Sequence, residues 1–150
     1  MKPVNKRPFH LSIIFFFISS MTIWFMPLAS RDGISALLYV LASIFWMFII
    51  LGFLVMRPVS RRRKNDKKYR QKARIPLLQF FSNKPALIFD ALLIVGLIVI
   101  LLSFLIRTLP EWVTLPAVFL FVFSLEMHGL FNSRNYEYMS VVNNRNFRVF

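Results

Sequence analysis

The chain contains no cysteine and only two histidines, His10 and His128. Without cysteine it can form neither disulfides nor thiolate metal sites, and membrane redox enzymes that pass electrons through cysteine pairs are excluded. Two histidines are too few for a histidine-rich metal cluster. No cofactor and no metal site is therefore expected.

Acidic residues are also scarce, because six Asp and Glu stand against nineteen Lys and Arg, which gives a formal charge of +13. In a soluble chain such an excess would indicate nucleic-acid binding. Here 57% of the residues are hydrophobic and the mean hydropathy is +0.61, values that are typical of a membrane protein. The positive charge then has a simpler origin, because Lys and Arg are retained on the cytoplasmic side of membrane segments. No nucleic-acid partner is expected.

Glycine is rare as well, and the four glycines form no G-x-x-x-G pattern. Close helix packing through that motif is therefore excluded. Ala36, Ala42 and Ser43 are the small residues expected to provide helix contacts in the second apolar stretch.

Four apolar stretches are long enough to cross a hydrocarbon core of about 30 Å as helices. The turns after the first and third stretches are short, so the sequence predicts two antiparallel helical hairpins in one transmembrane domain. The fold class expected is therefore all-α integral membrane, with spans at about 9–29, 34–56, 86–106 and 112–131.

The first stretch follows a basic start and could be read as a cleaved signal peptide. Its apolar part exceeds the usual length of about 7 to 15 residues for such a segment, and Pro27 would occupy an unfavourable position before a cleavage site. A retained transmembrane helix is therefore preferred.

The cations predict the orientation of these hairpins. Seventeen of them belong to the N-terminus, the central loop 57–85 and the tail 132–150, whereas Arg31 and Arg107 belong to the two short turns. The positive-inside rule then places both termini in the cytoplasm and Trp24 and Trp112 near the outer interface. The expected location is a cell membrane, with a bacterial inner membrane as the specific prediction.

The central loop carries a dense basic run, with ten Lys or Arg and one acid, Asp66, between Arg57 and Arg74. It could bind anionic lipid headgroups, each cation near the surface contributing about 1 kcal/mol. The alternative is an anchor that only fixes the topology. The loop ends in an apolar stretch, Ile75 to Pro85, expected to lie at the membrane interface. The lipid-contact candidates are Arg61, Arg62, Arg63, Lys64, Lys67, Lys68, Arg70, Lys72 and Arg74.

The tail after Asn132 contains two β-prone runs that flank Asn143 and Asn144. Paired Asn residues tolerate a tight hairpin turn, so these runs predict a β-hairpin. The alternative is a disordered or membrane-apposed tail.

Two acids fall within the apolar spans, Asp90 in the third and Glu126 in the fourth. Counting along each helix at about 1.5 Å per residue places both roughly 5 to 10 Å inside the cytoplasmic boundary. His128 and His10 reach the same end, so Asp90, Glu126, His128 and His10 could form a polar cluster that holds a proton or an ion, with Asn132 and Arg134 close by. The alternative is that the acids are structural and pair with cations such as Arg74 or Lys84.

Because no catalytic motif is present, the chain is not expected to be an enzyme. The leading hypothesis is a small polytopic membrane protein that acts by binding, as an accessory or regulatory subunit or as an immunity-type protein. Its expected partners are anionic phospholipid headgroups together with a membrane protein or further copies of itself. The alternative is a small oligomeric transporter or exporter that uses Glu126 or Asp90 as a coupling carboxylate, and a lipid-modifying enzyme ranks below both.

Overall fold

The computed structural model describes residues 4–31, 33, 35–66, 80–106 and 110–147, with side chains placed as far as residue 143. All regular elements in these ranges are helices. In chain order they are α1 (Arg7–Met21), the 3₁₀ turn η1 (Thr22–Phe25), α2 (Met26–Arg31), α3 (Ser35–Val55), α4 (Arg57–Asn65), α6 (Lys84–Leu105), α7 (Glu111–Phe131) and α8 (Arg134–Phe147).

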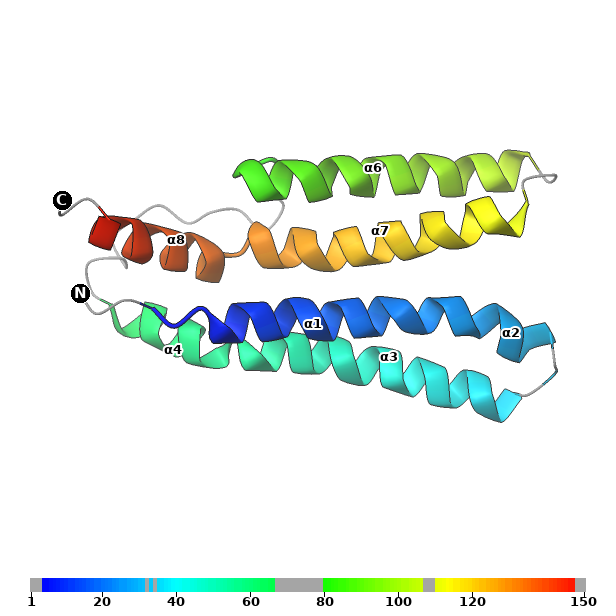
Figure 1. The fold of residues 1–150 in the computed structure, drawn as a ribbon, viewed down its shortest axis with the longest axis horizontal. Helices are drawn as coiled ribbons and strands as arrows, with labels where there is room; N and C mark the ends of the chain where they lie inside the picture. The colour runs from blue at the N-terminus through cyan, green and yellow to red at the C-terminus, as the bar shows by residue number, and fades with distance from the viewer. Residues whose placement is uncertain (1–3, 32, 34, 67–79, 107–109, 148–150) are drawn as a thin grey trace.

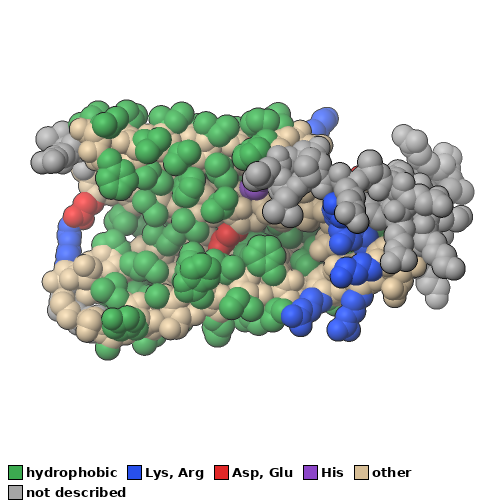
Figure 2. Space-filling model, turned by 180° about the vertical axis from the view of Figure 1, so that it is seen from behind, with side chains coloured by type: hydrophobic (Ala, Val, Ile, Leu, Met, Phe, Trp, Pro, Cys, Tyr) green, Lys and Arg blue, Asp and Glu red, His purple; other side chains and the backbone are tan. Residues whose placement is uncertain are grey.

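Four of the helical stretches are long and apolar enough to cross a membrane: Arg7–Arg31, Ser35–Asn65, Lys84–Leu105 and Glu111–Phe131. This confirms the predicted all-helical fold and its four candidate membrane spans. Hydrophobic side chains cover most of the described surface in Figure 2, and most of the visible Lys and Arg side chains gather toward one end.

The first stretch is not one continuous α-helix, because η1 interrupts it just before Pro27. Proline has no N–H group and cannot bond the carbonyl four residues earlier, that of Ile23. The Met26 amide bonds the Ile23 carbonyl instead, which closes a tighter 3₁₀ turn. The local change of pitch thus follows from one residue in the sequence.

The helices pair as two hairpins, α1 with α3 and α6 with α7. In the first pair the ring of Phe16 lies directly over Gly52, where an added Cβ would come within 2.4 Å of the ring. The Ser12 hydroxyl also donates to the Gly52 carbonyl at 2.7 Å. In this hairpin a single glycine, Gly52, therefore permits the close approach of the two helices. Ala36, Ala42 and Ser43 were expected to provide that contact, but Ala36 and Ser43 are exposed.

The four helices lie in a single row in the order α6, α7, α1 and α3, as Figure 1 shows. The hairpins meet through α1 and α7, where Phe17 packs edge-on against Phe119 and Phe123. Over an apolar segment of 18 residues in each candidate span, 33% of the residues are buried in the spans containing α1 and α7. The corresponding share is 6% in the span containing α3 and 17% in the span containing α6. The outer helices thus present most of their apolar surface outward.

A well-packed core lies at the end of the molecule that holds both chain ends (Figure 1). There α4 prolongs α3, and α8 packs against both α4 and α7. Tyr138, Met139 and Val142 of α8 are buried together with Met56 and Val59.

The predicted β-hairpin in the tail is wrong, because Arg134–Phe147 is one helix. The buried residues Tyr138, Met139 and Val142 recur with helical spacing, so burying them on one side favours a helix over strand propensity. Asn143 lies in that helix and its side chain accepts a hydrogen bond from the Val4 amide at 3.1 Å. It does not form a turn.

The predicted central loop begins as a helix, α4, and its last residues fold back onto α6 and α7. Residues 75–79 of the predicted interfacial stretch, along with Lys67, Lys68, Arg70, Lys72 and Arg74, lie outside the described residues.

Candidate functional site

A polar network joins α6 and α7 near the end of the molecule that carries both termini. Asp90, in the second turn of α6, is fully buried. Its Oδ1 lies 2.6 Å from His128 Nδ1 on α7. Asn132, one helical turn beyond His128, donates through Nδ2 to the two carboxylate oxygens at 3.3 and 3.4 Å.

Residues 80–83 close this network from the loop side. The Phe81 amide donates to Asp90 Oδ2 at 2.6 Å, and the Ser82 hydroxyl donates to Asn132 Oδ1 at 2.5 Å. The Phe80 ring lies over the His128 ring, with 4.5 Å between ring centroids. The carboxylate is thus held by two helices and by the turn that leads into α6.

The turn contains an unusual backbone conformation, because Phe81 has a φ of +57°. A non-glycine residue in this region costs roughly 1 kcal/mol or more and persists where its surroundings hold it. The conformation directs the Phe81 amide at Asp90. Asn83, two residues on, caps α6 by accepting from the Ala86 amide and donates to the Phe131 carbonyl.

The donors around Asp90 define the hydrogen-bond pattern. Carboxylate oxygens accept hydrogen bonds, so the His128 ring donates to Asp90 through Nδ1. Asn132 Nδ2 lies 2.9 Å from His128 Nδ1, and both nitrogens direct hydrogens at the same carboxylate.

Glu126 belongs to a second polar site, between the two hairpins. Its carboxylate accepts from the Ser19 hydroxyl at 2.6 Å and from the Ser20 hydroxyl at 2.9 Å. Both serines are fully buried, and Glu126 is 7% exposed. Ser19 and Ser20 are the thirteenth and fourteenth residues of the 25-residue stretch Arg7–Arg31. The carboxylate therefore lies beside the middle of the first candidate span, although Glu126 is only five residues before the end of α7.

The structure thus divides the four predicted cluster residues. It brings Asp90 and His128 together with Asn132, and it places Glu126 beside α1 instead. His10 lies in the first turn of α1, exposed, where it lines a pocket with Lys6 and Phe9. Glu126 and His128 diverge because residues two apart on a helix face different neighbours.

Among the described residues, neither acid is paired with one of the loop cations proposed as structural partners. Asp90 is bonded by His128, Asn132 and the Phe81 amide, and Lys84 is exposed at the start of α6. Arg74 lies outside the described residues. Arg31 of α2 and Glu111 of α7 form an ion pair between the two hairpins, at the end of the helices opposite to Asp90.

The predicted lipid-contact residues Arg61, Arg62, Arg63 and Lys64 form the second half of α4. Arg57, Arg61 and Lys64 are exposed and follow each other at helical spacing, so they share one side of the helix. On the inner side, the Tyr138 hydroxyl donates to Asp66 at 3.3 Å. Burial, and then the nearby Asp66 carboxylate, raises the pKa of Tyr138.

The serine partners of Glu126 were missed in the sequence, although a signal was present. Ser12 and Ser19 recur seven residues apart, with Phe16 between them, on one side of an otherwise apolar helix. Polar residues within a span face the protein interior, so this side of α1 marks where a buried carboxylate would find donors. The Phe81 amide gave no comparable signal, because it depends on one backbone angle.

Among the described residues, no three His, Asp or Glu side chains are arranged to hold a metal ion. Comparison of the chain with protein-family models, with curated proteins and with solved structures gives no match.

Proposed function

We propose that this protein is a polytopic membrane protein that acts by binding, as an accessory or regulatory subunit or as an immunity-type protein. The observation that supports this most is the position of the core. Residues outside the apolar stretches, from the N-terminus, α4 and α8, are packed into one buried cluster at the end with both termini.

A loop and a tail that served only to orient the chain would need no core. Here Val59 of α4 and Tyr138 and Val142 of α8 are each at most 3% exposed. Their burial holds α4 in place, so its outer side is a fixed surface with Arg57, Arg61 and Lys64 exposed. A fixed row of cations complements an acidic patch on a partner.

The proposed orientation places this end in the cytoplasm and the Arg31–Glu111 pair outside. It rests on the positive-inside rule and on the seventeen cations that the sequence has in the N-terminus, the central loop and the tail. The proposed location is a bacterial inner membrane. A reporter enzyme fused after Phe150 should be active in the cytoplasm, and activity only outside the cell would overturn the orientation.

The binding function can be tested by crosslinking in native membranes. A photo-crosslinker in place of Lys64 should capture a defined partner, and the charge reversals Arg57→Glu and Arg61→Glu together should abolish the capture. Lys84→Glu, an exposed cation on α6, is the matched control and should leave the capture intact. Capture that survives the double reversal, or crosslinks only between copies of this chain, would contradict the accessory role.

A second candidate function is a small proton-coupled transporter that works as an oligomer. The position of Glu126 favours it, because a carboxylate beside the middle of a candidate span, between the two hairpins, is costly and often functional. Proton-dependent uptake into proteoliposomes should then be lost in Glu126→Gln, which keeps the shape and an acceptor for the serine hydroxyls. Asp90→Asn serves as the comparison, since it distinguishes which acid couples. Unchanged uptake in Glu126→Gln would exclude Glu126 from coupling.

A further inference from the structure

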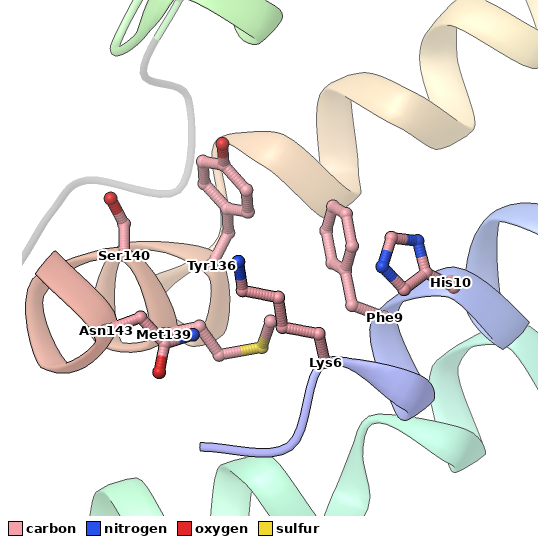
Figure 3. Close-up of a pocket in the computed structure, with 7 residues that line it drawn as sticks. All are labelled: Lys6, Phe9, His10, Tyr136, Met139, Ser140 and Asn143. Carbon is pink, nitrogen blue, oxygen red and sulfur yellow. The ribbon is translucent and has the colours of Figure 1, made fainter. Parts of the chain in front are cut away.

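A pocket of about 300 Å³ lies where the N-terminal segment meets α8, at the base of the first span. Figure 3 shows Lys6 reaching across it toward Tyr136, with Phe9 and His10 on the α1 side. Ser140 and Asn143 of α8 line the opposite side. Its volume is at the small end of the range for ligand sites, roughly 300–1,000 Å³.

The walls of this pocket are fixed by contacts between segments far apart in the chain. The Val4 amide donates to Asn143 Oδ1, which ties the N-terminal segment to α8. The Phe9 ring packs on Tyr136 with 5.3 Å between centroids and edge-on against Phe131 with 5.4 Å. Because these aromatic contacts join α1, α7 and α8, the pocket is part of the folded core.

Among the described residues, the lining is rich in hydrogen-bond donors and contains no acid. Lys6 brings an ammonium group, and Tyr136 and Ser140 bring hydroxyls. Asn143 uses its oxygen for the Val4 amide, so its NH₂ group remains available. Burial raises the pKa of Tyr136, so its hydroxyl keeps its proton at neutral pH. Such a set of donors matches an anionic oxygen-rich group.

Two further features indicate which kind of anionic molecule the pocket would bind. The pocket lies at the N-terminal end of α1, where the helix dipole favours negative charge. From His10 the same side of α1 continues into the span through Ile14 and Phe17, which are 51% and 44% exposed. An apolar track therefore leads directly from the pocket along the membrane-crossing helix.

We propose that this pocket binds the phosphate headgroup of an anionic phospholipid, with Lys6 on the phosphate and an acyl chain along Ile14 and Phe17. Tyr136, Ser140 and Asn143 donate to the remaining phosphate and glycerol oxygens. The site shares no residue with the cationic side of α4, so it stands whether or not the chain binds a protein partner there.

The test is native mass spectrometry of the full-length protein released from nanodiscs that contain phosphatidylglycerol, phosphatidylcholine or an equal mixture. The unaltered chain should retain phosphatidylglycerol in preference to phosphatidylcholine. Lys6→Met, which keeps the length of the side chain, should lower that preference about tenfold, because a charge-assisted bond is lost. Tyr136→Phe, which keeps the stack on Phe9, should lower it by a smaller factor.

Lys84→Met is the matched control, because Lys84 is an exposed cation near the same end of the molecule that does not line the pocket. It should retain phosphatidylglycerol as the unaltered chain does. Equal retention by Lys6→Met and Lys84→Met would overturn the proposal. Addition of inorganic phosphate distinguishes the sources: a lipid site keeps its phosphatidylglycerol, whereas full displacement by millimolar phosphate would assign the pocket to a soluble phosphate compound and refute the lipid.

Discussion

The substitution Asp90→Asn tests the network between α6 and α7 most directly. It preserves the size of a fully buried side chain while removing its charge and replacing one acceptor oxygen by a donor. Asp90 receives hydrogen bonds from the Phe81 amide and from His128, each at 2.6 Å, and longer ones from Asn132. Every one of these partners is a donor, so the new NH₂ group meets donors.

The expected loss follows from what can rearrange. The remaining carbonyl oxygen can keep the Phe81 amide, and His128 can move its proton to Nε2 and accept from the new amide through Nδ1. The Asn132 amide, which donates to both carboxylate oxygens, then keeps a single carbonyl oxygen as its acceptor on this side chain. The charge-assisted bonds also become neutral ones, which the lower desolvation cost of an amide partly offsets. The free energy of unfolding should fall by about 2 kcal/mol.

Reversible unfolding in mixed micelles measures this loss. Nitrogen chemical shifts of the His128 ring report the tautomer, which should change from Nδ1–H to Nε2–H in the variant. Glu111→Gln is the control, because Glu111 is an exposed acid whose ion pair with Arg31 should contribute less than about 1 kcal/mol. The reasoning would be refuted by equal losses in the two variants, or by a His128 ring that keeps its Nδ1 proton when Asp90 is replaced.

Two further predictions concern packing and pH. Gly52→Ala should destabilise the first hairpin by about 1–3 kcal/mol, because the new methyl group would meet the fully buried Phe16 ring. Gly129→Ala, where an added Cβ would have no atom within 4 Å, should be neutral or slightly stabilising. Thermal unfolding of both variants in the same detergent measures the difference. Burial raises the pKa of Tyr138 and of Tyr136, so the folded state holds these protons more tightly than the unfolded state, and the contribution of the two tyrosines to stability should be constant below about pH 10 and fall above it. Tyr138→Phe should make that decline shallower, and an unchanged slope between about pH 9 and pH 11 would contradict the assignment.

The four spans could be predicted because membrane insertion depends on the summed hydropathy of about twenty consecutive residues. The sequence carries that sum locally, and the break at Pro27 likewise follows from one residue. The sequence also shows that Ser12 and Ser19 share one side of α1, but it does not show which helix this side faces.

Tertiary structure decided what lies between the spans and beyond them. The tail is a helix because Tyr138 and Val142 are buried against residues more than seventy positions earlier in the chain, Met56 and Val59. Local β propensity could not report that burial.

The sequence by itself determined that this chain is an all-helical membrane protein with four candidate spans and a strong asymmetry of charge. Only the tertiary structure decided which buried acids meet which partners. Asp90 and His128 are 38 residues apart, and Ser19 and Glu126 are 107 apart. The physical reason is that hydropathy acts on each segment alone, whereas a buried carboxylate takes its donors from whichever helix the packing places beside it.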